Sequence, residues 1–300
     1  MRIAIVGAGT MGQGLVRLFS GAGHEVTVFD PQQEAARRCA EAAKGTVASP
    51  TLADAVRNAD LSIEAAVEQL EIKQEIFNEL ATHTREDAIL ATNTSALSIG
   101  DIGGKLSADR RSRMLGMHFF NPPDVVPAVE VVPLPETDPA AVAQVTDLLV
   151  GAGKEPAVVA DTPGFVANRI QHAMIAEAWR CFDEGIATPE AIDRIVSGSF
   201  GFRLFAYGPF ALGDFNGLDI YQSVLESLAT AYGDRFAPPA GLVGRVERGA
   251  VGVRTGEGAL SYDDGQAERA VERRDRILKR LAELRVTELA DGSTAQRDTG

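Results

Sequence analysis

Four histidines are the side chains of this sequence that change charge near neutral pH, and His118 is the best placed of them to act as a base. His24 lies in a turn before a predicted strand and His83 at a polar helix end, where solvated side chains are expected. His118 instead lies among apolar residues of a predicted strand, Met114 to Phe120, directly before a loop broken by prolines. A histidine in that position can take the proton of a substrate hydroxyl.

Glu130 is the candidate partner of His118, because it lies on the extended segment that returns after the proline-broken loop. A carboxylate on one imidazole nitrogen fixes the tautomer and raises the basicity of the other nitrogen. The competing explanation is a core histidine with a satisfied hydrogen bond, which is common. His172 is the alternative base, since it shares a helix face with Asn168, although a packed helical histidine is the simpler explanation for it.

Glu68 and the turn from Asn93 to Ser95 each follow a predicted buried strand. In an open α/β sheet, ligands bind at the carboxyl ends of the strands, so these residues are candidates for a binding site on position alone. Ser95 has a second interpretation, as the N-cap of a helix that begins near Leu97.

The elements that must position these residues begin at the N-terminus, where Gly7, Gly9 and Gly12 follow an apolar run from Arg2 to Val6. In a G-x-G-x-x-G turn, the first glycine permits the tight turn, the second lets the backbone approach a pyrophosphate, and the third lets helix pack on strand. An apolar helical stripe that includes Met11 comes next, followed by a second strand. This order predicts a dinucleotide-binding domain of the Rossmann type rather than an ordinary glycine-rich turn.

Asp30 closes the second predicted strand, Glu25 to Phe29. A carboxylate at that point accepts hydrogen bonds from an adenosine ribose and repels a 2′-phosphate. Pro31, Gln32 and Gln33 follow, so no arginine is close by to bind such a phosphate. The predicted cofactor is therefore NAD rather than NADP.

The order of apolar patterns predicts an α/β Rossmann domain with a doubly wound, mostly parallel sheet, followed by an all-α C-terminal domain. The predicted strands are 2–6, 25–29, 59–66, 88–91, 114–120, 125–132 and 156–160. The predicted helices after the first are 32–44, 70–81, 140–150, 165–182, 189–197, 218–231 and 267–284. The expected domains are 1–160 for NAD binding and 161–290 for substrate binding and dimerisation, with a hinge at 161–164 and a flexible tail at 291–300.

A chain of 300 residues that is 45% hydrophobic can bury a large core, and its formal charge of −13 argues against a nucleic acid or an anionic membrane as partner. No apolar run approaches the roughly 18 residues of a membrane span. Because a strand is predicted from residue 2, no cleavable signal sequence is expected. Cys39 and Cys181 lack metal-binding spacing, which favours a reducing cytoplasm and predicts no metal site. The expected partner is a small-molecule substrate.

A series of segments that spans nearly the whole chain resembles the 3-hydroxyacyl-CoA dehydrogenases, including the 3-hydroxybutyryl-CoA dehydrogenases. In chain order, the segments are GAGTMGQG, VEQLEIKQEIF, NTSALSI, GMHFFNPP, VEVVP, DTPGFVANRI, GPFALGDFNGLD and GVRTGEGALSY. The resemblance implies reversible NAD-linked oxidation of a 3-hydroxyl to a 3-ketone, and it is consistent with a homodimer formed through the C-terminal domain.

The resemblance also implies roles for individual residues. His118 would be the base and Glu130 its partner, with Ser95 and Asn168 as hydrogen-bonding groups on the substrate. Arg254 stands where the acyl-CoA enzymes usually have lysine. The expected cofactor-binding set is Gly7, Gly9, Thr10, Met11, Gly12, Asp30, Glu68, Lys73, Asn93, Ser95, Asn121 and Arg254, of which Glu68, Lys73 and Asn121 would lie near the nicotinamide half.

Two departures from the acyl-CoA enzymes leave the carrier of the substrate open. The stretch between Phe29 and Asn58 is too short for the helix–turn–helix excursion that helps those enzymes hold coenzyme A. The segments NPPDVVPAVEVVPLPET and NRIQHAMIAEAWRCFDEG are closer to the L-gulonate 3-dehydrogenase or lambda-crystallin branch, and L-carnitine dehydrogenase is similar too. The alternative function is therefore oxidation of a free 3-hydroxy acid. An alternative of another class is a non-catalytic NAD-binding structural protein.

Overall fold

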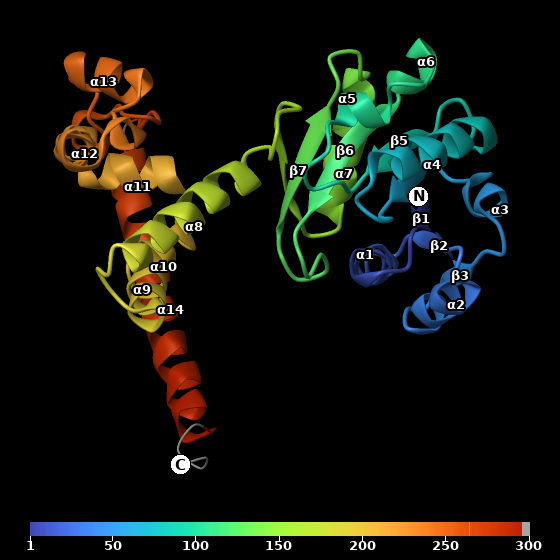
Figure 1. The fold of residues 1–300 in the computed structure, drawn as a ribbon, viewed down its shortest axis with the longest axis horizontal. Helices are drawn as coiled ribbons and strands as arrows, with labels where there is room; N and C mark the ends of the chain where they lie inside the picture. The colour runs from blue at the N-terminus through green and yellow to red at the C-terminus, as the bar shows by residue number, and fades with distance from the viewer. Residues whose placement is uncertain (264, 296–300) are drawn as a thin grey trace. The chain divides into compact units, whose positions relative to one another are not determined.

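The computed structural model describes residues 1–263 and 265–295 of the chain, which divides into two compact units, Met1–Ala176 and Glu177–Gly300. The first unit contains a β-sheet with its helices, and the second is helical (Figure 1). The division falls inside helix α8 (Ala167–Asp183), which begins three residues after the predicted hinge at 161–164 ends. The predicted functional boundary at residue 160 therefore stays a prediction.

The first unit is built on an eight-stranded sheet with the order β3-β2-β1-β4-β5-β6-β7-β8. The strands are β1 (Arg2–Val6), β2 (Glu25–Phe29), β3 (Thr46–Ala48), β4 (Leu61–Glu64), β5 (Ile89–Thr92), β6 (Met114–Phe119), β7 (Ala128–Pro133) and β8 (Glu155–Val158). All neighbouring strands are parallel except β6 and β7. The predicted Rossmann sheet is confirmed, with the short edge strand β3 as an unpredicted addition. The chain reverses its direction of winding between β1 and β4, which is where such sheets bind ligands.

Helices cover both faces of this sheet. They are α1 (Thr10–Gly21), α2 (Gln33–Glu41), α3 (Leu52–Val56), α4 (Leu70–His83), α5 (Ile99–Ile102), α6 (Ala108–Arg111) and α7 (Pro139–Gly151). Because alternate side chains of a strand point to opposite faces, Ile3 and Ile5 of β1 pack in one core with α1, α2 and α7. Ala4 and Val6 pack in the other core with α3, α4 and α5. The carboxyl ends of the central strands are thus held from both sides.

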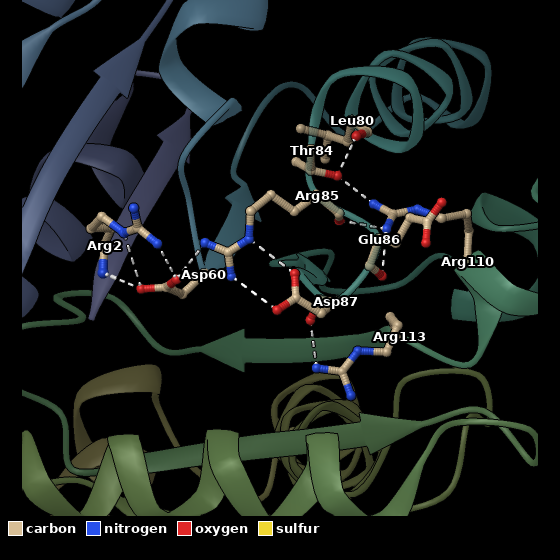
Figure 2. A network of polar contacts seen from close by, with 9 residues as sticks. All are labelled: Arg2, Asp60, Leu80, Thr84, Arg85, Glu86, Asp87, Arg110 and Arg113. Carbon is tan, nitrogen blue, oxygen red and sulfur yellow. Dashed lines mark hydrogen bonds and ion pairs between the residues drawn. The ribbon is translucent and has the colours of Figure 1, made fainter.

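An ionic network lies at the amino ends of the strands (Figure 2). Asp60, directly before β4, pairs with Arg2 at 2.8 Å and with Arg85 at 3.1 Å. Arg85 also pairs with Asp87 at 2.9 Å, and Arg113 donates to the carbonyl oxygen of Asp87 at 2.7 Å. The hydrogen bond from Arg2 is the main reason why the pKa of Asp60 lies well below its usual range. The charged groups at this edge pair mainly with one another, although the buried Nε of Arg113 has no hydrogen-bond partner in the part of the chain that the structure describes.

The second unit continues from α8 through helices of very different length. They are α9 (Pro189–Gly198), α10 (Phe200–Leu204), α11 (Pro209–Asn216), α12 (Leu218–Tyr232), η1 (Asp234–Phe236), α13 (Ala240–Glu247), η2 (Val253–Thr255) and α14 (Gln266–Ala295). The predicted helices at 189–197 and 218–231 are confirmed, whereas α10, α11 and α13 were not predicted. Helix α14 continues to Ala295, so the first part of the predicted tail is helical, and residues 296–300 lie outside the described residues. Over residues 1–263 and 265–295, no helix has the length and apolar composition needed to cross a membrane.

Asp214 of α11 is the polar centre of the second unit. Its buried carboxylate accepts hydrogen bonds from the backbone of Ala259 at 2.8 Å and of Leu260 at 2.9 Å, and from the hydroxyl of Tyr262 at 3.0 Å. Burial, followed by this contact with Asp214, raises the pKa of Tyr262 above its usual value. A Cβ atom on Gly258 would lie 2.2 Å from a carboxylate oxygen of Asp214, so only glycine fits there. The segments GPFALGDFNGLD and GVRTGEGALSY are therefore held together by structural contacts.

Candidate active site

The glycine loop after β1 has the geometry that its spacing predicts. Gly7 has φ +113°, and a Cβ atom there would lie 2.5 Å from the carbonyl oxygen of Ala65. A Cβ atom on Gly12 would lie 1.9 Å from the carbonyl oxygen of Gly7. At Gly9, by contrast, nothing lies within 4 Å of a Cβ position, and no side chain caps the start of α1. The first and third glycines are thus required for packing, while the second leaves the helix N-terminus open to an anion.

A pocket of about 590 Å³ lies beside this loop, at the switch point between β1 and β4. Ile72 and Ile76 of α4 contribute apolar walls, and Asp30 contributes the carboxylate that follows β2. Of the predicted cofactor-binding residues, those that line the pocket are Gly7, Gly9, Thr10, Met11 and Asp30. An apolar slot with one carboxylate and an uncapped helix end fits the adenosine and pyrophosphate of a dinucleotide.

Asp30 also holds the glycine loop in place. One oxygen of its carboxylate accepts the backbone N–H of Ala8 at 2.8 Å, and the other accepts that of Gln32 at 2.8 Å. Because each carboxylate oxygen can accept two hydrogen bonds, both oxygens keep a lone pair for a ribose. The carboxylate therefore serves the loop and the pocket together.

His118 and Glu130 lie directly opposite each other on the antiparallel strands β6 and β7. Their side chains are buried, and Nδ1 of His118 lies 2.7 Å from Oε2 of Glu130. The other oxygen, Oε1, accepts the backbone N–H groups of Val166 at 3.0 Å and of Ala167 at 2.9 Å, at the start of α8. An ionised carboxylate only accepts hydrogen bonds, so the tautomer of a neutral imidazole that fits this contact has its proton on Nδ1 and a lone pair on Nε2. Among the described residues, no hydrogen-bond partner of Nε2 is found.

Two phenylalanines flank the imidazole of His118. The ring centroid of Phe120 lies 4.7 Å from that of His118, and the centroid of Phe165 lies 5.6 Å away. Phe165 has φ +47°, a left-handed conformation that costs free energy for a residue other than glycine. In this backbone conformation, the buried ring of Phe165 lies against the imidazole of His118, the candidate base. Sequence analysis missed Phe165, because a side chain gives no sign of its own positive φ.

Ser95 and Asn168 come together across a long sequence separation. Nδ2 of Asn168, in the first turn of α8, donates to the carbonyl oxygen of Ser95 at 2.8 Å. The alternative interpretation of Ser95 as a helix N-cap is wrong, because Ser98 caps α5 by accepting the backbone N–H of Asp101. His172, the alternative base, is exposed, and its Nδ1 donates to the carbonyl oxygen of Asn168 at 2.8 Å within the same helix.

Glu68 anchors the turn that carries Ser95. Its Oε1 accepts the backbone N–H groups of Ser95 at 2.8 Å and of Ala96 at 3.1 Å, together with the hydroxyl of Thr94. Burial acts to raise the pKa of Glu68, but the hydrogen bond from Thr94 and the charge of Lys73 outweigh it, so this pKa lies below its usual value. Glu68 is therefore ionised at neutral pH.

Lys73 is buried, and its ammonium group lies between two carboxylates. Nζ lies 2.7 Å from Oε1 of Glu64 and 3.2 Å from Oε2 of Glu68. Glu64 is the last residue of β4 and has no exposed surface. Sequence analysis did not single out Glu64, although a carboxylate at the end of an apolar strand was a detectable signal.

The remaining predicted residues have different positions. Oδ1 of Asn93 accepts the backbone N–H of Phe119 at 2.9 Å, which ties the end of β5 to the end of β6. Asn121 follows β6 and is exposed. Arg254 belongs to the second unit, where its guanidinium pairs with Asp219. Within residues 1–263 and 265–295, no group of three or more His, Cys, Asp and Glu side chains is arranged to hold a metal ion.

Models of the 3-hydroxyacyl-CoA dehydrogenases match both parts of the chain. The NAD binding domain matches residues 2–51 and 42–162, and the C-terminal domain matches residues 164–262. The chain belongs to the 3-hydroxyacyl-CoA dehydrogenase family. The resemblance found in the sequence, the fold class and NAD as the cofactor are thereby confirmed.

Individual relatives cover most of the chain. A 3-hydroxybutyryl-CoA dehydrogenase of Clostridioides difficile is 34% identical over 285 residues, which cover 88% of this chain and 100% of that protein. The 5-formyl-3-hydroxy-2-methylpyridine 4-carboxylate 5-dehydrogenase of Mesorhizobium japonicum is 33% identical over 284 residues, which cover 88% of this chain and 91% of that protein. The crystal structure of the 3-hydroxyacyl-CoA dehydrogenase of Archaeoglobus fulgidus matches with a TM-score of 0.82 and 33% identity, covering 94% of this chain and 99% of that one.

Membership of the 3-hydroxyacyl-CoA dehydrogenase family makes the protein an NAD-dependent oxidoreductase that acts on CH–OH groups. The family and the relatives' names favour an enzyme over the alternative of a non-catalytic NAD-binding structural protein. The relatives that are named for hydroxyacyl-CoA substrates do not favour the free hydroxy acid alternative.

Proposed function

We propose that the protein catalyses the reversible oxidation of the 3-hydroxyl of a 3-hydroxyacyl-CoA to a 3-ketone. The observation that carries this proposal is the buried His118–Glu130 pair, on the same sheet whose first strands form the dinucleotide pocket. NAD, when bound, accepts the hydride that leaves C3 of the substrate.

In this proposal, His118 takes the hydroxyl proton at Nε2 while the hydride leaves C3, so that the C–H and O–H bonds break and the C=O bond forms. Glu130 stabilises the imidazolium that results, and the proton returns to the substrate in the reverse reaction. Ser95 and Asn168 orient the hydroxyl and carbonyl oxygens. An amide group has two N–H donors, so Asn168 keeps one for the substrate while the other binds the carbonyl oxygen of Ser95.

The proposed cofactor site has two halves. The glycine loop and the start of α1 hold the pyrophosphate, and Asp30 holds the adenosine ribose. The residues proposed to lie near the nicotinamide half are Glu68, Lys73, Asn93, Ser95 and Asn121, of which the buried Lys73 acts through Glu68. Glu68, Asn93 and Ser95 support this assignment, since they follow β4 and β5, the strands that lie between the pocket and β6.

The coenzyme A moiety is expected to contribute little to the binding of the substrate. Only α2 and β3 occupy the stretch between β2 and α3, so there is no room for an excursion that grips coenzyme A. Arg38 in this stretch is exposed and pairs with Glu34 at 3.5 Å. We therefore expect free coenzyme A to compete weakly, with recognition concentrated near the acyl end. Tight competition, or a raised KM of Arg38→Ala for an acyl-CoA but not for a truncated thioester, would contradict this expectation.

A steady-state assay of NADH formation tests the proposed function. The substrates are 3-hydroxybutyryl-CoA, a longer 3-hydroxyacyl-CoA and free 3-hydroxybutyrate, each with NAD in excess. The proposal predicts that both thioesters are oxidised with a much higher kcat/KM than the free acid. Turnover of the free acid alone would contradict it.

We also propose a homodimer formed through the helical domain, with residues 161–290 as that domain and 1–160 as the NAD-binding domain. The described part of the second unit exposes large apolar side chains, among them Trp179, Phe205 and Phe210, which favours burial against a second copy. Light scattering that gives the mass of a monomer at micromolar concentration would contradict the dimer. A cytoplasmic location, supported by the free cysteines Cys39 and Cys181, and a place in fatty acid metabolism belong to the same proposal.

A further inference from the structure

A buried ion pair lies at the carboxyl edge of the sheet, outside the dyad. Glu64 is 0% exposed and Lys73 is 1% exposed, and their charged atoms lie 2.7 Å apart. Glu64 also accepts the hydroxyl of Thr92 at 2.7 Å and the backbone N–H of Ala66 at 2.7 Å. Taking two charges out of water costs free energy, and a buried pair of this kind often contributes no more stability than apolar residues of the same volume. Stability alone therefore does not explain why Glu64 and Lys73 are buried as an ion pair.

Lys73 connects this pair to Glu68. Nζ of Lys73 lies 3.2 Å from Oε2 of Glu68, whose side chain is 40% exposed. The other oxygen of Glu68 holds the turn of Thr94, Ser95 and Ala96 through a hydroxyl and two backbone N–H groups. Contacts thus run without a break from Glu64, inside the core, to the exposed turn that carries Ser95.

The strand order indicates which part of the cofactor approaches the turn of residues 94–96. A cofactor that reaches from Asp30, after β2, to His118, in β6, has to cross the ends of β1, β4 and β5. Neighbouring strands lie about 4.8 Å apart, so the four intervals from β2 to β6 span roughly 19 Å. The ends of β4 and β5 carry Glu68 and the turn of residues 94–96. These groups therefore lie where the reactive half of the cofactor approaches the dyad.

We propose that Glu64 is a positioning residue of the dehydrogenase reaction. It fixes the Lys73 ammonium beneath Glu68, so that Glu68 stays ionised and holds the Ser95 turn in the geometry that hydride transfer requires. Lys73 then acts on the reaction through Glu68 rather than by direct contact with NAD. This inference rests on the proposed function for its kinetic consequence, but not for its effect on cofactor binding.

A double-variant experiment separates positioning from stability. Lys73→Met leaves the buried carboxylate of Glu64 without its cation, and Glu64→Gln leaves the ammonium of Lys73 with only the partly exposed Glu68, so both single variants lose thermal stability. The double variant Glu64→Gln/Lys73→Met removes both charges and recovers most of that stability. We nevertheless expect its kcat to be lowered about 10- to 100-fold and its NADH affinity to be weaker by severalfold, because Glu68 has lost its support. Glu71→Gln, in the exposed first turn of α4, is the matched control and behaves like the native protein.

Native kcat and native NADH affinity in the folded double variant would overturn the proposal, since the pair would then act on stability alone. If the double variant does not fold, Glu68→Gln tests the same chain of contacts from its exposed end. The same kinetic defect is expected there, and native values would overturn the proposal. Should the native protein fail to oxidise any 3-hydroxyacyl-CoA, the proposed function fails, while fluorescence titration of the variants with NADH still decides the positioning role.

Discussion

The amino and carboxyl edges of the sheet differ in how far their polar groups are paired within the protein. At the amino edge, Arg2, Asp60, Arg85 and Asp87 pair with one another (Figure 2). At the carboxyl edge, polar groups keep capacity for a ligand: α1 has no side-chain cap, and Nε2 of His118 has no partner among the described residues. Bonding capacity that is open to a ligand, rather than the number of charges, therefore marks the candidate functional edge, since the Nε of Arg113 at the amino edge, unpaired within the described chain, is buried. Variants at the carboxyl edge should change turnover or binding, and variants at the amino edge should change stability.

The largest effect is expected from His118→Ala. Loss of the base should lower kcat by roughly 10²–10⁴-fold, the usual range for general acid–base catalysis, with NAD affinity almost unchanged. Steady-state kinetics and an NADH titration measure the two quantities. His172→Ala is the control and should keep its turnover. Near-native turnover of His118→Ala, with a loss in the control, would move the base to His172.

Glu130→Gln should have a smaller effect of the same kind. The glutamine oxygen can still accept the N–H groups at the start of α8, but its amide group then donates to Nδ1 of His118. That places the imidazole proton on Nε2, where the lone pair is needed, so turnover should fall about 10- to 100-fold. Glu136→Gln, at an exposed carboxylate paired with Arg111, serves as the control. Equal turnover of the two variants would mean that Glu130 has only a structural role.

Sequence analysis predicted the parts of the carboxyl edge that depend on local order. Residues 1–30 contain the strand, the glycines and Asp30, so one short segment was enough to predict the pocket. His118 and Glu130 could also be paired, because Glu130 is close enough in sequence to fold back on His118, and the register of β6 and β7 places the two opposite each other. The main strands and the long helices of the second unit were found for the same reason, since each is a continuous apolar pattern.

The residues that were missed depend on contacts between distant segments. Glu64 becomes interpretable only once α4 brings Lys73 to it and β5 brings Thr92. The role of Phe165 depends on its positive φ, which cannot be predicted from the residue type. Ser95 was compatible with a helix N-cap until Ser98 was seen in that position. Short helices such as α10 and α13 contain too few turns to give a periodic pattern.

Asp30→Asn separates two functions of the carboxyl edge, because it should lower cofactor affinity without changing the rate of the reaction at saturating cofactor. The variant keeps one oxygen for the glycine loop but loses the negative charge that repels a 2′-phosphate. NAD affinity should fall by roughly tenfold, with a smaller preference over NADP and a nearly native kcat at saturating cofactor. Binding titrations with both cofactors measure this. An unchanged preference for NAD would show that Asp30 does not contact the ribose.

The smallest effect is expected at the amino edge, from Asp60→Asn. The depressed pKa of Asp60 means that its ionised form stabilises the fold at neutral pH, by about 1 kcal/mol for a partly exposed network. This contribution is fully present above the unfolded pKa, near 3.9, and is lost as the pH falls through the folded value. In urea unfolding, the gap between native and variant protein should therefore narrow below about pH 4. Glu34→Gln, which removes a surface pair on α2, is the control and should unfold like the native protein at every pH. A changed kcat of Asp60→Asn would contradict the assignment of the amino edge to stability alone.

The most direct test of the catalytic assignment is single-turnover NADH formation from a 3-hydroxyacyl-CoA at saturating NAD, measured across pH. Only a neutral imidazole can take the hydroxyl proton, so a histidine base predicts that the native rate falls on the acid side. His118→Ala should bind NAD but react slowly, without that fall on the acid side. If His118→Ala keeps the native rate, or keeps the same loss of rate at acid pH, His118 is not the base and the account of this edge is wrong.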